Sequence, residues 1–224
     1  KLCFVEFVKR NNDTKISSTT TKKKHIVLYF HGSPGYRHFL TEEQIELFLN
    51  AYIEDMRLIS IDRPGWGDSD MHLNYSLMDF ASDVEQLIDH LVKDSSSDTN
   101  QDNSNDKVSI VGYSAGGPFA LACAAHPTLS KRIQSVVVVS SLGPRDQPDS
   151  TQLMPLKFRF GFFLSKYFVR GVAWILAHDA KSFLSDPDKY ICENWSHSPE
   201  DSEYMQTHES VRKVFIENAV IARA

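Results

Sequence analysis

The sequence has no uninterrupted apolar run of about 18 residues, the length that marks a candidate transmembrane helix. It also has little cysteine, since Cys3, Cys123 and Cys192 are the only three in 224 residues. They are widely spaced and odd in number, which fits neither a disulfide framework nor a zinc site. They favour a reducing compartment such as the cytoplasm, and a single disulfide stays open.

An excess of basic residues is absent as well. The chain has 24 Lys and Arg against 29 Asp and Glu, a net charge of −5, so we do not expect it to bind nucleic acid. With 42% hydrophobic residues it has enough apolar side chains for a sizeable core. Because it opens at Lys1 inside an apolar segment and without methionine, we expect a fragment that has lost any N-terminal targeting signal.

Predicted strands and helices alternate over residues 1–144. Several strands are apolar on both faces, which is typical of a mostly parallel sheet with helices on both faces, an α/β fold. Polar tracts at 11–24 and 94–107 read as surface loops. The predicted strands are residues 2–8, 25–30, 57–61, 107–112 and 132–141, and the predicted helices are residues 41–52, 76–94 and 115–125.

The composition changes after Pro144. Residues 151–178 contain four basic and seven aromatic residues but no Asp or Glu, and we expect an amphipathic helix pair there. The core of a helical subdomain explains most of these aromatics, and contact with a membrane surface is the less favoured alternative. Residues 198–224 predict one more helix. We therefore expect a core at 1–144 and a helical cap at 145–224.

The pattern G-x-S-x-G at Gly112–Gly116 is the strongest chemical signal in the chain. It lies directly after a predicted strand and before an Ala-rich helix, the context that a nucleophile elbow requires. Such a turn strains the backbone of its serine, and glycines on either side avoid a steric collision. The turn lifts the Ser114 hydroxyl clear of the sheet, at the positive end of the helix.

Three motifs in this order resemble the α/β-hydrolase family: His31-Gly32-Ser33-Pro34-Gly35, then Asp62-Arg63-Pro64-Gly65-Trp66-Gly67-Asp68-Ser69, then Gly112-Tyr113-Ser114-Ala115-Gly116-Gly117. The resemblance covers roughly residues 2–144. It implies that Ser114 is the nucleophile of acyl transfer and that the backbone N–H groups of Ser33 and Ala115 form the oxyanion hole. It implies no metal and no cofactor.

The same resemblance assigns His31 to bracing its loop and Asp62 to stabilising a turn. A serine at position 114 argues against the dehalogenase and epoxide-hydrolase branches, which carry Asp there. In this family the triad acid and histidine follow the nucleophile in the chain. Asp146 and Asp149 match an alternative position of the acid, but the sequence shows no late histidine turn. We therefore expect a chain truncated in the cap, without the C-terminal core strands and nearly inactive alone.

The sequence thus predicts a serine hydrolase that cleaves an ester or related acyl bond of a small apolar substrate. Peptidase, thioesterase and carbon–carbon bond hydrolase chemistries stay open, because the same elbow serves each. The alternative is a catalytically inactive ligand-binding or scaffold protein with this fold.

Overall fold

The structure of the chain is a computed structural model that describes residues 1–7, 25–33, 35–52, 56–93, 107–141, 143, 152, 154, 156–194 and 199–221. The chain divides into two compact units, Lys1–Ser141 and Leu142–Ala224. Most of the two predicted polar loops, and also Asp146 and Asp149, lie outside the described residues.

The first unit contains a five-stranded sheet in the order β1-β3-β2-β4-β5. Its only antiparallel pairing among the described strands joins β1 to β3, and the other pairs are parallel. The fold class predicted from the sequence, α/β with a mostly parallel sheet, is confirmed. The strands are β1 (Phe4–Phe7), β2 (His25–Phe30), β3 (Met56–Ile61), β4 (Val108–Tyr113) and β5 (Ile133–Val139).

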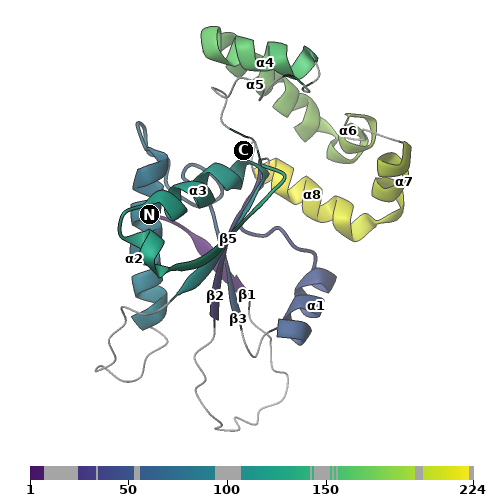
Figure 1. Cartoon of the computed structure of the whole chain (residues 1–224). Helices are drawn as coiled ribbons and strands as arrows, with labels where there is room; N and C mark the ends of the chain where they lie inside the picture. Colours follow the sequence, from purple (N-terminus) through teal and green to yellow (C-terminus); the bar gives the residue numbers. More distant parts are fainter. Residues whose placement is uncertain are drawn as a thin grey trace. The chain divides into compact units, whose positions relative to one another are not determined.

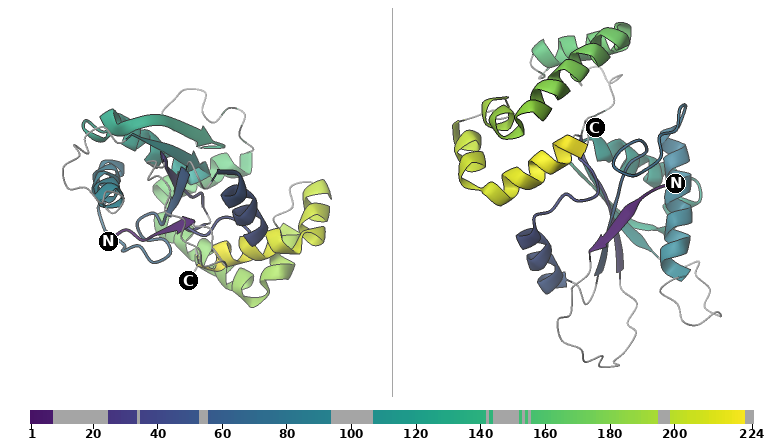
Figure 2. Two further views of the ribbon diagram at one scale, coloured as in Figure 1. Left: turned by 90° about the horizontal axis from the view of Figure 1, so that it is seen from below. Right: turned by 180° about the vertical axis from the view of Figure 1, so that it is seen from behind.

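Helices lie on both faces of this sheet (Figures 1 and 2). Helices α2 (Leu77–Lys93) and α3 (Gly117–Ala125) cover one face, and α1 (Glu42–Tyr52) covers the other. The short 3-10 helices η2 (Ser114–Gly116) and η3 (Leu129–Arg132) lie on either side of α3 in the sequence. The polypeptide thus leaves each parallel strand at the same edge of the sheet, where open α/β sheets build their sites.

The core of the first unit follows from the periodicities of its strands and helices. Side chains alternate between the faces of a strand, so that Ile26, Leu28 and Phe30 of β2 all point to the α2 face. Helix α2 meets them with an apolar stripe at helical spacing. The buried members of this stripe are Phe80, Val84, Ile88 and Leu91.

Reciprocal capping fixes the first turn of α1 and of α2. At α1, the Thr41 N–H donates to Gln44 Oε1 (3.0 Å), and the Gln44 N–H donates to Thr41 Oγ1 (3.2 Å). Ser76 and Asp79 exchange the same two bonds before α2. These contacts satisfy N–H groups that the helix leaves unpaired. The predicted start of α1 next to Thr41 is confirmed.

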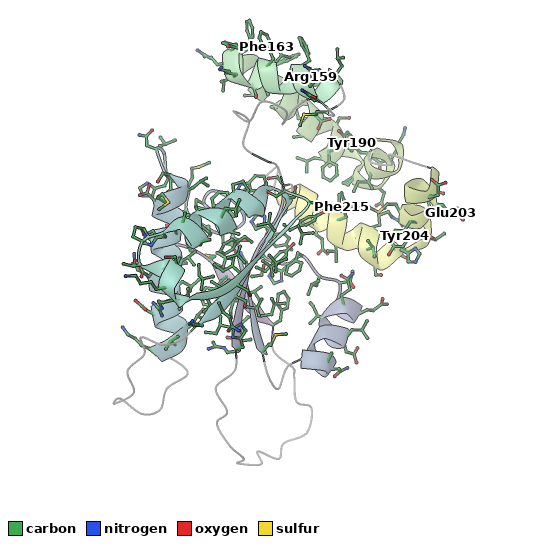
Figure 3. All side chains as sticks on the ribbon, in the orientation of Figure 1. Arg159, Phe163, Tyr190, Glu203, Tyr204 and Phe215 are labelled. Carbon is green, nitrogen blue, oxygen red and sulfur yellow. The ribbon has the colours of Figure 1, made fainter. Side chains whose placement is uncertain are left out.

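The second unit consists of helices. They are α4 (Leu156–Tyr167), α5 (Val169–Ser185), α6 (Pro187–Asn194), α7 (Pro199–Thr207) and α8 (Glu209–Ile221). Phe183 and Ile191 are buried at its centre, with Tyr190 and Phe215 packed against them (Figure 3). Among the described helices, none is long and apolar enough to cross a membrane.

The sequence prediction was wrong at two places in this unit. The single helix expected over 198–224 is two helices that meet at His208. The Arg212 guanidinium donates to the carbonyls of Met205 (2.8 Å) and Gln206 (3.2 Å), and these bonds satisfy the end of α7. Helix α6 was not predicted.

Several described aromatic side chains of α4 and α5 are exposed, although Phe183 of α5 is buried. Phe160, Phe163, Tyr167 and Trp174 lie outside the buried centre of the unit. Core packing, the explanation favoured from the sequence, therefore does not account for these four. Phe163 stands on α4 in Figure 3, where it contacts Tyr167 (ring centroids 4.9 Å apart).

Candidate active site

Ser114 has the strained backbone predicted for a nucleophile elbow. It follows β4 directly, opens η2, and has φ = +48°, a value that non-glycine residues rarely adopt. A single residue held in this region costs on the order of 1–3 kcal/mol. Its side chain is partly buried and stands at the start of a helix that continues through Ala125, where free N–H groups favour negative charge.

Two glycines allow the elbow to lie tightly against the sheet. A Cβ on Gly112 would lie 2.8 Å from the Gly116 carbonyl oxygen. A Cβ on Gly116 would collide with the carbonyl oxygen of Phe30, at the end of β2. The first contact is the collision predicted from the motif. The second arises from the neighbouring strand, so Gly116 is required by a contact 86 positions away in the chain.

The loop after β2 passes directly beside the nucleophile. Phe30 and Gly112 are paired across β2 and β4, so His31-Gly32-Ser33 and the elbow leave neighbouring strand ends. A Cβ on Gly32 would lie only 3.0 Å from the Cβ of Ser114. The structure thereby brings the predicted oxyanion loop and the predicted nucleophile together. Ser33, the next residue, is exposed.

His31 braces this loop, as expected from the sequence. Its ring is 1% exposed, its Nδ1 lies 2.8 Å from the Gly32 carbonyl oxygen, and its Nε2 accepts the Arg63 N–H (3.2 Å). Since Nε2 accepts, the ring proton is on Nδ1 and is donated to Gly32. Burial, and secondarily the Arg63 charge, lowers the pKa of His31 to about 3. A neutral ring with both nitrogens bonded is a poor general base for Ser114.

Asp62 stabilises the turn after β3, also as expected. Its buried carboxylate accepts the backbone N–H groups of Arg37 (2.7 Å) and Asp68 (3.1 Å) and pairs with the Arg37 guanidinium. Gly67 is required here, because its φ is +54° and a Cβ would collide with the Asp62 carboxylate. These bonds hold the second motif against Arg37, in the segment after the first motif, and they leave Asp62 no geometry for a role as triad acid.

Comparison with known proteins agrees with this geometry. Residues 25–183, more than half of the chain, match the sequence model of the family described as alpha/beta hydrolase fold. The chain belongs to the α/β hydrolase family. Two solved structures cover 99% of the chain with TM-scores of 0.55 each: a bromoperoxidase from Bacillus anthracis (17% identity, 67% of that chain) and an epoxide hydrolase from Bacillus megaterium (14% identity, 68% of that chain). At these identities they show the fold.

A curated relative is more similar in sequence but matches over a shorter range. It is a Bacillus subtilis (strain 168) protein assigned as a 2-succinyl-6-hydroxy-2,4-cyclohexadiene-1-carboxylate synthase, 31% identical over 118 residues. The match covers 51% of the chain and 36% of that protein. The α/β hydrolase described here therefore aligns with only about a third of the relative's length.

The serine–histidine pair Ser82–His126 in this α/β hydrolase joins two helices. Ser82 Oγ of α2 lies 3.1 Å from His126 Nε2, at the end of α3. The Leu129 N–H donates to His126 Nδ1 (3.3 Å), so the neutral ring carries its proton on Nε2 and donates it to Ser82. Ser82 in turn donates to the Met78 carbonyl (3.1 Å). A base that already donates to the serine cannot take its proton.

The catalytic base of Ser114 was not found in the described part of the chain. No group there hydrogen-bonds the Ser114 hydroxyl, and His25, His126 and His208 each bond other partners. Within the same residues, no three His, Cys, Asp or Glu side chains gather as metal ligands. What the described site offers is a serine at a helix start, beside a loop that can carry a second N–H donor.

Arg63 is the site residue that the sequence reasoning missed. It is only 5% exposed, and its Nη2 donates to the Gly32 carbonyl and to Ser33 Oγ, at 2.9 Å each. Its guanidinium carbon lies over the rings of Trp66 (4.9 Å) and Phe119 (5.3 Å). The signal that could have found it is its place directly after a buried strand, where a cation is unexpected.

Proposed function

We propose that this α/β hydrolase is a serine hydrolase that cleaves an ester or related acyl bond in a small apolar substrate. The observation that carries the proposal is the left-handed backbone of Ser114 between β4 and a helix, with the Gly32 loop beside it. Backbone strain of this kind gathers at functional sites, and Ser114, unlike Ser140 with its φ of +49°, also lies in the elbow motif. Serine at this position also favours acyl transfer over the chemistry of the epoxide hydrolases that share the fold.

In the proposed reaction, the Ser114 hydroxyl attacks the acyl carbon while a base removes its proton. The carbonyl oxygen becomes an oxyanion that accepts the N–H groups of Ala115 and Ser33. Collapse of this intermediate expels the protonated leaving group and leaves an acyl-enzyme, which water then hydrolyses with the help of the same base. Loss of one oxyanion donor costs about 100- to 1,000-fold in kcat.

The base and its acid partner are proposed to come from residues outside the described part of the chain. Asp146 and Asp149, the alternative acid positions, are among these. Residues 145–224 are proposed as a helical cap whose aromatic side chains favour an apolar substrate. The curated relative's named reaction does not extend to this chain, since the match covers 36% of that protein.

Hydrolysis of short-chain p-nitrophenyl esters by the intact protein tests the proposal. Ser114→Ala should lower kcat at least about 1,000-fold, because the nucleophile is lost. Ser82→Ala is the matched control, since it removes a serine hydroxyl that contacts a histidine away from the elbow and should keep the activity. A Ser114→Ala variant with unchanged turnover would refute the proposal. A folded wild-type protein that binds esters without turnover would support the inactive binding protein instead.

Contact of residues 151–178 with a membrane surface stays the less favoured prediction. Lys166 lies over the exposed Tyr167 ring (5.1 Å), an arrangement compatible with an interfacial helix. Cosedimentation with vesicles of anionic and of zwitterionic lipid tests this. Binding to the anionic vesicles alone, lost when Phe160 and Phe163 are replaced by serine, would establish the contact.

A further inference from the structure

Arg63 is a buried cation without a carboxylate partner among the described residues. Four other arginines, Arg37, Arg57, Arg132 and Arg212, each form an ion pair with Asp or Glu. Arg63 forms none within the described ranges, and its Nε is buried without an acceptor there. Removing a guanidinium from water without a counter-charge is unfavourable. A buried arginine without a counter-charge therefore points to a role other than stabilisation of the fold.

The guanidinium holds one peptide group of the oxyanion loop. The carbonyl oxygen of Gly32 accepts two donors, Arg63 Nη2 (2.9 Å) and His31 Nδ1 (2.8 Å). In a planar trans peptide the carbonyl and the following N–H point in opposite directions. Fixing the Gly32 carbonyl therefore fixes the direction of the Ser33 N–H. A second Arg63 bond, to Ser33 Oγ, restrains the same residue from its side chain.

We propose that Arg63 is a positioning residue, which together with His31 holds the Gly32–Ser33 peptide so that the Ser33 N–H faces the oxyanion formed at Ser114. The inference rests on the proposed acyl-transfer function and adds to it a residue that does not touch the substrate. The closeness of Gly32 to Ser114 makes this orientation matter, because a small rotation of the peptide would turn the N–H away from the reacting atoms. Displacements of about 1 Å cost enzymes on the order of 100-fold in rate.

The Tm of Arg63→Met separates a positioning role from a purely structural one. A purely structural role predicts a lower Tm, whereas the positioning role predicts a stable fold. If Arg63 is replaced by methionine, the Gly32 carbonyl keeps the His31 donor, and the exposed Ser33 hydroxyl can bond water. No buried acceptor is orphaned, and an apolar stem remains between Trp66 and Phe119. Exchange of a buried ion for an apolar side chain is often neutral or stabilising. The variant should therefore fold with an unchanged or higher Tm.

The test compares Arg63→Met and Arg63→Lys with the wild type in the intact protein. Arg63→Met should lower kcat about 10- to 100-fold with little change in KM, because oxyanion contacts act mainly in the transition state. A trifluoromethyl ketone forms a hemiketal with the serine oxygen, and the former ketone oxygen becomes the oxyanion. Its affinity should fall by a similar factor. Arg63→Lys, which retains an N–H donor, should recover part of both losses.

Arg57→Lys is the matched control. Arg57 binds Glu6 and the Leu91 carbonyl at the opposite end of the sheet, so its replacement should affect stability but not kcat. A folded Arg63→Met variant with wild-type kcat and ketone affinity would overturn the inference while Ser114 stays essential. If Ser114→Ala keeps its activity, the proposed function itself fails. A parallel loss of Tm and kcat in both Arg63 variants would assign Arg63 to the fold alone.

Discussion

At the scale of single residues, close backbone contacts gather at the ends of β2 and β4, where Ser114 also has a strained backbone. Ser114 adopts φ = +48°, and Gly112 and Gly116 leave no space for a Cβ. Ser140, directly after β5, has a similar φ of +49°, and the pairing of β4 with β5 shifts register between Val108 and Ser109. Strain of this kind persists only where the surroundings enforce it, and it gathers at functional sites.

Replacement of Gly116 by alanine should disrupt the elbow. The new Cβ would meet the backbone carbonyls of Phe30 and His31, which cannot move without breaking β2. We expect a loss of several kcal/mol in unfolding free energy, measured by urea denaturation, and loss of ester hydrolysis. Gly161→Ala is the control, because a Cβ on Gly161 meets nothing within 4 Å in α4 and should stabilise the helix by up to about 1 kcal/mol.

His31 should make stability depend on pH on the acid side of neutrality. Its pKa in the folded protein, about 3, is below its ordinary value of 6.5. In this pH range the His31 ring binds a proton in the unfolded chain but not in the native state. The free energy of unfolding therefore falls as the pH drops from 6.5 toward 3. Between pH 7 and 4.5 the loss should be about 2–3 kcal/mol.

His31→Asn isolates this contribution, since asparagine can donate to the Gly32 carbonyl but does not titrate. The variant should be less stable than the wild type at pH 7, and the difference between the two should shrink by about 2–3 kcal/mol at pH 4.5. Urea unfolding at both pH values measures it. Equal acid sensitivity of the two proteins would contradict a neutral, buried His31.

Local sequence predicted Ser114 and its glycines but not the role of Arg63. The elbow motif is contained in the five residues Gly112–Gly116, and the steric contact at Gly112 is local. The partners of Arg63 are Gly32 and Ser33, about 30 positions earlier. Arg63 belongs to the second motif and Gly32 and Ser33 to the first, but neither motif alone shows the contact, because it arises only when β2 and β3 pair.

At the scale of elements, the spacing of hydrophobic residues and the helix-capping residues predicted most of the strands and helices. All five strands and the helices of the first unit lie within a few residues of their predicted bounds. Helix α6 was missed although its signal is present. Asp186 Oδ1 accepts the Lys189 N–H (3.1 Å), and Pro187 occupies the first helical position. The helix is short and only weakly apolar, so its periodicity does not reveal it.

The buried stripe of α2 predicts contrasting costs of truncation. Ile88 is fully buried among the strands, whereas Leu77 is 41% exposed at the start of the helix. Ile88→Ala should cost about 2–5 kcal/mol of unfolding free energy, and Leu77→Ala less than about 1 kcal/mol. Denaturant unfolding of both variants checks this. If the two substitutions lower the unfolding free energy by similar amounts, Ile88 does not face the core as described.

At the scale of the whole molecule, β5 is exposed more than a parallel strand usually is. It pairs with β4 alone among the described strands, and Val137, Val138 and Val139 are exposed. Parallel sheets normally bury both faces, and an open apolar edge promotes association. A polypeptide of residues 1–224 should therefore self-associate in sedimentation velocity as its concentration rises.

Val137→Lys should weaken this association without a large cost in stability, because Val137 is 50% exposed and a charge at an edge opposes strand pairing. The sedimentation profile should shift toward the monomer, with Tm nearly unchanged. Leu47→Lys is a control at an exposed apolar site on α1, and should leave association as it is. If the wild type does not self-associate, or if Val137→Lys and Leu47→Lys change its association equally, β5 is not the surface through which the chains associate.

The sequence predicted the fold class of this α/β hydrolase but not the chemistry of its substrate. Fold class follows from alternation of strands and helices, which is a local property repeated along the chain. In the proposed function, substrate choice depends on side chains of the cap, such as those of α4 and α5, and no sequence motif places these side chains. The exposure of Phe160 and Trp174 illustrates this, since their aromatic character alone suggested burial.

The most direct test of the central claim is covalent labelling of the intact protein with a fluorophosphonate, followed by mass spectrometry of its peptides. A nucleophilic Ser114 predicts a single phosphonyl adduct on the peptide that contains it. The adduct should be absent from Ser114→Ala and retained in Ser82→Ala. Equal labelling of the Ser114→Ala variant, or an adduct on another residue of the wild type, would contradict the account.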